Sequence, residues 1–260
     1  MGLRVGVGVG VCDAGRVAAW TPASLAPYEY WRGDAVGLAD PVASWASTGS
    51  KGNALAQSNA TFKPAYVASY APLGSQPVVH ASGTNKFLGT GAGSVTDYKF
   101  LHNGAGMTIA LVADITVESA VRQILSTQLL LALANVGCLL YLDASNRVNF
   151  ATGNVTIQVV AAQSSALTSG PRVIVVRYSS TRGTAGTRAE MRIGRAVNGT
   201  SGEAATPSSA NASDQLRVTA SAAATFGATA RVAELMLLDR VLTDTEVSTY
   251  ESYVLGRYGV

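Results

Sequence analysis

Acidic residues are the first candidates for chemistry, because paired carboxylates can serve as acid and nucleophile in glycoside hydrolysis. A retaining enzyme needs them about 5 Å apart, which alternate positions on one strand can supply. The three residues after Glu190 and after Glu234 contain no carboxylate. Glu29 and Asp34 are five residues apart and would point to opposite faces of a straight strand. We therefore predict no catalytic residues, and glycoside hydrolase activity is the least favoured alternative.

The histidines and the glycine-rich start of the chain complete no other catalytic or phosphate-binding motif. His80 and His102 are the only histidines, and neither lies beside a convincing nucleophile and carboxylate in the sequence. No G-x-S-x-G is present. The glycines from Gly6 to Gly10 complete neither G-x-G-x-x-G nor G-x-x-x-x-G-K-[ST]. We expect the histidines to be surface or half-buried polar residues, and we expect no cofactor.

Charge and cysteine content exclude further partners. Charged residues make up 13% of the chain, and its net charge of +3 comes from scattered arginines without a block of like charge. Nucleic acid is therefore not an expected partner. Cys12 and Cys138 are too few and too far apart for a disulfide framework or a metal site. We expect two free thiols, with Cys138 buried in a strand.

Aromatic side chains could bind a carbohydrate, because their rings stack on sugar faces while nearby polar groups bind hydroxyls. Aromatic residues are only 7% of the chain, and we expect most of them to fill the core. Those expected in loops or near a terminus are the candidates for glycan contact. They are Trp20, Tyr66, Tyr70, Tyr98 and Phe100.

The elements that must position such residues are mostly short strands. From Tyr28 onward, β-rich runs are separated by Gly, Ser, Asn and Pro at intervals typical of a sandwich. The run from Met107 to Ile115 is typical of a largely buried central strand. The Ser/Thr/Gly/Ala-rich tracts 179–187 and 199–213 should be exposed loops. The predicted strands are Tyr28–Arg32, Val78–His80, Met107–Ile115, Gln123–Thr127, Cys138–Asp143, Val148–Ala151, Thr156–Ala161, Arg172–Tyr178, Ala189–Ile193, Gln215–Val218 and Arg231–Asp239.

One apolar stretch, Ile124 to Leu142, is almost long enough to span a membrane. Polar residues and a glycine interrupt it, so we interpret it as two strands joined through Asn135 and expect no membrane span. The start of the chain, Met1 to Gly15, lacks the basic region and sustained apolar region of a signal peptide. We expect no secretion through such a signal.

The last thirty residues, Arg231 to Val260, predict a strand followed by a helix. Thr243 and Glu246 form an S/T-x-x-E capping box, in which hydroxyl and carboxylate bind the first backbone N–H groups. Gly256 and Gly259 can each end the helix. Apolar residues at three- and four-residue steps form a stripe that needs a sheet to cover it; they are Val247, Tyr250, Val254 and Tyr258.

The first residues alternate strictly between glycine and valine. In an extended strand Val5, Val7, Val9 and Val11 would face one side and glycines the other. Such a strand leaves its N–H and C=O groups unpaired unless it joins another sheet. We predict an arm that adds to a neighbouring sheet of its own domain or of another subunit, with a disordered leader as the alternative.

Both ends of the chain resemble concanavalin A-like (laminin-G-like) jelly-roll domains, which occur in bacterial surface proteins and bacteriophage virion proteins. At the C-terminus the matching residues are Ala233, Glu234, Asp239, Arg240, Leu242, Thr243, Glu246, Tyr253, Arg257, Tyr258 and Gly259. Near the N-terminus they are Leu25, Pro27, Tyr30, Trp31, Arg32, Asp34, Trp45, Gly52, Asn53, Ala54 and Gln57. Pro64, Gln76–Val78 and Gly83–Leu88 continue the pattern more loosely.

The resemblance implies an all-β fold, a two-sheet antiparallel jelly-roll sandwich. The alternating start of the chain adds an N-terminal extended arm, and the pattern after Thr243 adds one C-terminal helix. We assign residues 1–23 to the arm and residues 24–260 to one jelly-roll domain. Relatives of this kind often bind calcium, but here Ser47 and Lys51 replace an Asp and an Asn of the family turn. We therefore predict no metal, with Asp34, Asp97 and Asn53 as weak alternatives.

The same resemblance implies a function. We predict a non-enzymatic virion structural protein, a bacteriophage capsid decoration or a tail or fibre appendage. It would contact other virion proteins through the arm, form a homo-oligomer and be made in the bacterial cytoplasm. The alternative is a carbohydrate-binding module for glycans of the bacterial surface.

Overall fold

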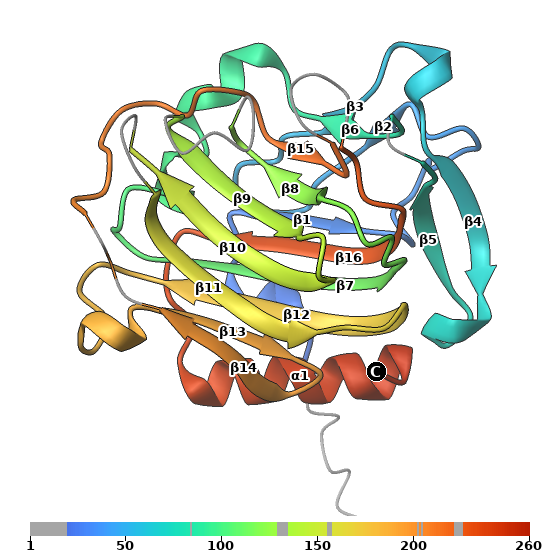
Figure 1. Cartoon of the computed structure of the whole chain (residues 1–260). Coiled ribbons are helices and arrows are strands. Elements are labelled where there is room, and N and C mark those ends of the chain that lie inside the picture. The colour runs from blue at the N-terminus through green and yellow to red at the C-terminus, as the bar shows by residue number, and fades with distance from the viewer. Residues whose placement is uncertain are drawn as a thin grey trace, which may run out of the picture.

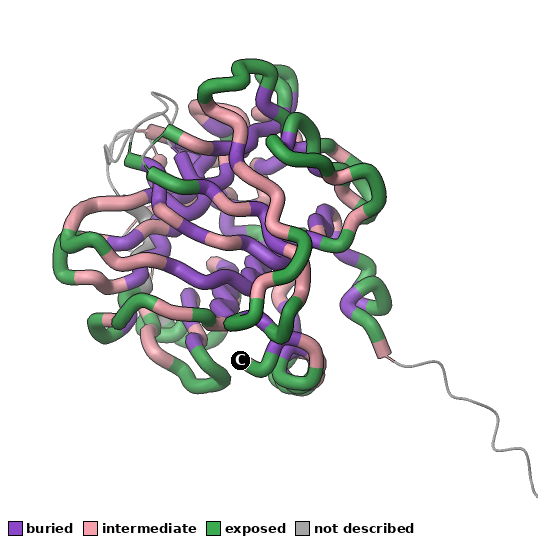
Figure 2. Tube along the Cα trace, turned by 90° about the vertical axis from the view of Figure 1, so that its right-hand side faces the viewer, coloured by how far each residue is buried: buried purple, intermediate pink, exposed green. Residues whose placement is uncertain are grey.

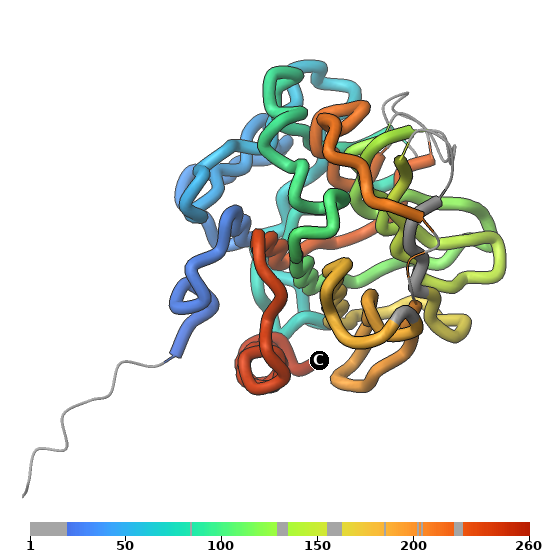
Figure 3. The backbone as a smooth tube through the Cα atoms, turned by 90° about the vertical axis from the view of Figure 1, so that its left-hand side faces the viewer, coloured from blue at the N-terminus to red at the C-terminus, as the bar shows by residue number. Residues whose placement is uncertain are grey.

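The computed structural model describes residues 20–83, 85–128, 135–154, 158–201, 203, 205–220 and 226–260. Residues 1–19, which contain Val5, Val7, Val9 and Val11 of the predicted arm as well as Cys12, lie outside the described residues. The first described residue, Trp20, packs its ring edge-on against Tyr253 at 5.8 Å between centroids. Figure 3 shows this N-terminal segment beside the C-terminal helix.

Two antiparallel sheets of eight strands each form the sandwich (Figure 1). The first, here called the helix-side sheet, has the order β14 (Ala196–Ser201), β13 (Ala189–Ile193), β12 (Gly170–Tyr178), β7 (Met107–Ile115), β16 (Ala230–Leu238), β5 (Gln76–Ala81) and β4 (Ala65–Tyr70), with β1 (Glu29–Arg32) paired to β16. The second, the open sheet, has the order β11 (Gln158–Ala166), β10 (Arg147–Gly153), β9 (Gly137–Leu142), β8 (Arg122–Ser126), β15 (Arg217–Val218), β6 (Leu88–Gly89), β3 (Leu55–Ala56) and β2 (Ser44–Trp45).

Short 3-10 turns and one α-helix complete the described part of the chain. The turns are η1 (Pro22–Leu25), η2 (Ala60–Phe62), η3 (Ala71–Leu73), η4 (Ala92–Thr96), η5 (Lys99–Leu101) and η6 (Ala185–Thr187). The helix is α1 (Asp244–Tyr258). Among the described residues no helix is long and apolar enough to cross a bilayer. The apolar stretch from Ile124 to Leu142 supplies β8 and β9 instead, as predicted.

The central strand β7 shows why this sequence makes two layers. Every residue of β7 is buried. Because side chains alternate along a strand, Ile109 and Leu111 enter the core between the sheets, whereas Ala110 and Val112 enter a second cluster under α1. A strand with both faces buried must lie between two covering layers. Figure 2 shows the buried residues concentrated inside the sandwich.

The helix closes the outer face of the helix-side sheet. Thr243 accepts from the backbone N–H of Glu246, whose side chain accepts from the N–H of Thr243, so the predicted capping box is present. The stripe of Val247, Tyr250, Val254 and Tyr258 is buried, as predicted. Of the two glycines that could end the helix, Gly259 does so, with a φ of 76°.

Every strand predicted from the sequence overlaps an observed one, but five strands were missed. Strands β2, β3 and β6 have only two residues each, which is too short for alternation to be visible. Strands β4 and β14 lie at sheet edges and contain no fully buried residue, so their sequences lack the strong apolar alternation of the central strands. The prediction of a loop from residue 199 is therefore wrong for the residues that belong to β14.

Candidate functional site

The outer face of the open sheet is the candidate site. The helix α1 packs on the opposite layer, and Figure 1 shows β8 to β11 facing the viewer. Along β9, Leu140 and Leu142 enter the core between the sheets. Tyr141, between them, must therefore project from the outer face. Its cross-strand neighbours must do the same, because directly paired residues share a face.

Four polar side chains form one row across this face, here called the polar row. Tyr141 pairs directly with Gln123 of β8 on one side and with Asn149 of β10 on the other. Asn149 pairs in turn with Gln163 of β11. A β-bulge after Gln123 directs both Ile124 and Leu125 into the core, which leaves the glutamine on the outer face.

Hydrogen bonds hold the β10 and β11 end of the row. The side-chain amide of Gln163 donates to Asn149 Oδ1 at 2.7 Å and to Asp143 Oδ2 at 3.3 Å. Asn149 Nδ2 donates to the carbonyl oxygen of Arg147 at 2.9 Å. Asn149 is only 5% exposed, whereas Gln163 is exposed. Gln163 is thus fixed through its amide nitrogen and can offer its carbonyl oxygen to a ligand.

Asp143 is a turn residue of the β9–β10 hairpin. Its Oδ1 accepts from the backbone N–H groups of Ser145 and Arg147, and its Oδ2 forms a 2.9 Å ion pair with the Arg147 guanidinium. Partial burial works to raise the pKa of Asp143, but these donors hold it below its ordinary value. Asp143 is therefore an ionised anchor for Arg147 and Gln163, and the polar row itself is neutral.

Tyr141 is the aromatic residue of the row. Its side chain is half-buried, and burial followed by the charge of Asp143 raises its pKa above the ordinary value. The phenol consequently stays protonated at neutral pH. A neutral hydroxyl on a ring held between two amides can donate and accept hydrogen bonds while the ring supplies apolar area.

The β8 end of the polar row, at Gln123, is shielded from solvent. Gln123 has no exposed surface, and neither of its amide atoms has a hydrogen-bond partner among the described residues. Its backbone N–H donates to the carbonyl of Phe226 at 2.6 Å, and its carbonyl accepts from Ala228. The segment 226–228 therefore runs beside β8 at this point, and Gln123 lies between that segment and Tyr141.

The aromatic residues proposed from the sequence do not gather at this row. Tyr98 lies between η4 and η5, as its predicted loop position required, but it is fully buried and its hydroxyl donates to Glu29 at 3.1 Å. Phe100 is half-buried against Tyr28, with the ring centroids 4.9 Å apart. A loop position near the core therefore placed these rings in packing contacts rather than on a binding surface.

The other three candidates are half-buried, and each packs against a different part of the fold. Trp20 packs on α1 through Tyr253. Tyr66 packs against the core between the sheets, whereas Tyr70 packs against the cluster under α1. Tyr70 also donates to Asp114 at 2.7 Å. The three rings therefore do not form a shared surface on which a sugar could stack.

The residues considered for calcium are divided between two places. Asn53 donates to Asp97 at 3.1 Å, but the Lys51 ammonium forms a 2.8 Å ion pair with the same carboxylate. Asp34 lies elsewhere, between Arg32 and Arg257. Within the described ranges no three His, Cys, Asp or Glu side chains are grouped to hold a metal.

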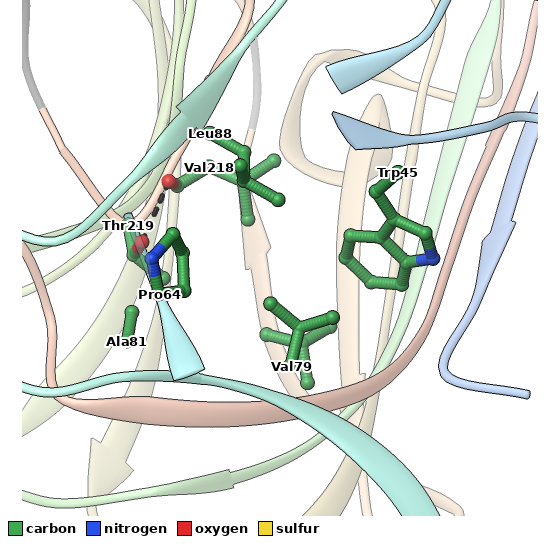
Figure 4. A pocket seen from close by; sticks show the side chains of 8 residues that line it. Trp45, Pro64, Val79, Ala81, Leu88, Val218 and Thr219 are labelled. Carbon is green, nitrogen blue, oxygen red and sulfur yellow. Dashed lines mark hydrogen bonds between the residues drawn. The ribbon is translucent and has the colours of Figure 1, made fainter. Parts of the chain in front are cut away.

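An apolar cavity between the sheets offers no alternative site. It has a volume of about 10 Å³, which is room for roughly one water. Figure 4 shows Trp45, Val79, Leu88 and Val218 around it. Its nearest polar group, the Thr219 hydroxyl, donates to the carbonyl oxygen of Val218 at 2.6 Å. The cavity is a packing gap in the core.

Sequence reasoning missed the polar row, although each residue lies in a predicted strand or next to one. The alternation of side chains along β9 was enough to predict that Tyr141 projects from one face of the strand, and Leu140 and Leu142 from the other. Which residues lie beside it depends on the register of three strand pairs, and no local pattern states that register.

Comparisons with known proteins agree on the architecture. No protein-family model matches the chain, and no curated protein matches its sequence. The CBM40 domain of the Ruminococcus gnavus IT-sialidase, bound to α2,6-sialyllactose, has a TM-score of 0.50 at 13% identity, over 66% of this chain and 96% of that one. The same domain bound to α2,3-sialyllactose has a TM-score of 0.50 at 14% identity, over 68% and 95%.

A third similar structure is the binding domain of botulinum neurotoxin DC in complex with SialylT. It has a TM-score of 0.55 at 7% identity, and the match covers 88% of this chain but only 52% of that one. Identities this low describe the fold alone. The chain has a concanavalin A-like, jelly-roll β-sandwich fold, with two antiparallel sheets and one C-terminal helix.

Proposed function

We propose that this protein is a non-enzymatic carbohydrate-binding domain that holds a glycan on the outer face of the open sheet. The observation that carries the proposal is the polar row, in which Tyr141 stands between Gln123 and Asn149, with Gln163 at the exposed end. A ring for the face of a sugar and amides for its hydroxyls are what such a ligand needs.

The charges in and near the polar row favour binding of sugar hydroxyls over catalysis. The carboxylate of Asp143 is held by Arg147 and by backbone N–H groups, so it is occupied rather than available as a base. The neighbouring amides and phenol carry no charge. Such a surface can bind sugar hydroxyls through neutral hydrogen bonds, each worth about 1 kcal/mol.

The comparisons support the same class of function. The CBM40 structures contain sialyllactose, and the neurotoxin domain is a binding domain in complex with SialylT. Their sequences are too distant to transfer a ligand, so the glycan must be found by experiment. α2,3-Sialyllactose, α2,6-sialyllactose and lactose are suitable first probes, because together they separate an acidic ligand from a neutral one.

The test is a glycan array followed by calorimetry with these probes. Tyr141→Ala should weaken binding at least tenfold, because it removes the only aromatic ring of the polar row. Tyr66→Ala is the matched control, since Tyr66 is an equally half-buried ring at the other end of the sandwich. Wild-type protein that binds no glycan, or equal losses in both variants, would refute the proposal.

The predicted virion role remains a separate prediction. It depends on an arm in residues 1–23, most of which lie outside the described residues. Neither the fold nor the comparisons support virion partners, homo-oligomer formation or a virion location over glycan binding. Deleting residues 1–15 would test the arm: the prediction requires a folded domain that no longer joins an assembly, and normal assembly would contradict it.

A further inference from the structure

The exposed end of the polar row meets the other sheet. Strand β11 is one edge of the open sheet and β14 is one edge of the helix-side sheet. A Cβ at Gly199 of β14 would lie 2.3 Å from the carbonyl oxygen of Gln163, so only glycine allows this approach. We call the contact between these two edge strands the seam. Gln163 belongs both to the polar row and to the seam.

A β-bulge brings a further amide to the seam. Met191 pairs with Gly199 and Arg192 pairs with Val197, which leaves Asn198 without an opposite residue. A bulge turns its extra residue out of the regular alternation. Asn198 Nδ2 donates to the carbonyl of Ile193 at 3.1 Å, which fixes the side chain.

The hydroxyl of Ser165 links this amide to the open sheet. Ser165 lies two residues after Gln163 on β11, is exposed, and donates to Asn198 Oδ1 at 3.4 Å. That distance is long for a hydrogen bond, so little free energy is lost when the hydroxyl turns to another partner. Ser165 and Asn198 thus place polar groups beyond Gln163, over the edge of β11 and on β14.

We propose that the glycan site continues across the seam, that Ser165 and Asn198 form a second subsite, and that the ligand is an oligosaccharide of at least two sugars. This inference rests on the proposed function. The row from Tyr141 to Gln163 crosses two strand spacings, roughly 10 Å, before it reaches the seam. At the other end Gln123 is fully buried. The terminal sugar therefore lies over Tyr141, and the rest of the glycan leaves across β11.

Calorimetry on the full chain with galactose, lactose, N-acetylneuraminic acid and α2,3-sialyllactose tests the proposal, together with the mono- and oligosaccharide forms of the strongest array glycan. The wild type should bind the oligosaccharides more tightly than their terminal sugars. Ser165→Ala should weaken oligosaccharide binding about fivefold, the value of one hydrogen bond, and leave monosaccharide binding within about twofold. Ser252→Ala on α1 is the matched control, because its hydroxyl is exposed on the other side of the molecule and donates only to Ser248.

Asn198→Ala provides the second variant and should show the same selective loss. Its melting temperature must be measured, since Asn198 also supports the bulge; Ser165→Ala has no such role. Equal affinity of the wild type for mono- and oligosaccharides, or equal losses for both in Ser165→Ala, would overturn the second subsite while the proposed function stood. Binding of no sugar at all would remove the proposed function and this inference with it.

Discussion

Tyr258, near the end of α1, donates a 2.8 Å hydrogen bond to the carboxylate of Glu234 in β16. Glu234 has no exposed surface, and Tyr253 also donates to the same oxygen, Oε2, at 3.4 Å. The bond therefore ties the helix to a fully buried carboxyl group. Burial raises the pKa of Glu234 above its ordinary value of about 4.5.

This relationship predicts how stability changes with pH. Because the folded state raises the pKa of Glu234, its contribution is fully present below about pH 4.5 and is lost as pH rises through the folded-state pKa. Glu234→Gln keeps an acceptor for Tyr258 but cannot ionise. We expect the variant to gain stability relative to the wild type as pH increases from 4 to 8. Urea unfolding at each pH measures the difference, and parallel curves for the two proteins would contradict the assignment.

The close approach of β14 to β11 at the seam leads to a second prediction about stability. Gly199→Ala would place a methyl group 2.3 Å from the carbonyl of Gln163, so β14 or β11 must shift. We expect a loss of about 1–3 kcal/mol of unfolding free energy, as for other overpacked positions. Gly186→Ala is the control, since a Cβ there meets nothing within 4 Å. Equal stability of the two variants would show that the strands can separate freely.

How much of the fold and of the candidate site could be predicted from the sequence depended on how far apart the interacting residues lie along the chain. The helix and its cap were predictable, because Thr243 and Glu246 are three residues apart and act locally. The buried strand β7 was predictable from its own composition. The position of Tyr98 was not, since its burial depends on Glu29, which lies 69 residues away. The polar row was missed for the same reason, because Gln123 and Asn149 lie beside Tyr141 only through strand register.

The free thiol in β9 should be inert in the folded protein. Cys138 has no exposed surface, and burial raises its pKa to about 12, so almost no thiolate exists at pH 8. In a Cys12→Ser variant, which leaves Cys138 as the only cysteine, iodoacetamide should not react until urea unfolds the chain. Mass spectrometry follows the modification. Rapid labelling without denaturant would mean that β9 opens in the native state.

A substitution of Gln123 can show whether this residue serves only the stability of the fold or also glycan binding. Within the part of the chain that the structure describes, both polar atoms of its amide are buried without partners, an arrangement that costs roughly 1–3 kcal/mol per unsatisfied group. Gln123→Leu removes both atoms and puts an apolar side chain of similar volume in their place. If the amide only packs the fold, the variant should be as stable as the wild type or more so, by up to about 2 kcal/mol, and glycan binding should not change.

A binding role predicts a different combination. Gln123→Leu should then still raise the melting temperature, but it should weaken binding of the glycan that lies over Tyr141. Gln76→Leu is a suitable control, since Gln76 is half-buried in β5 of the other sheet. Because Gln123 has no exposed surface, gain of stability with loss of affinity in Gln123→Leu alone would show that the buried amide positions Tyr141 for the glycan. Loss of stability in that variant would show that the amide has a partner in the folded protein.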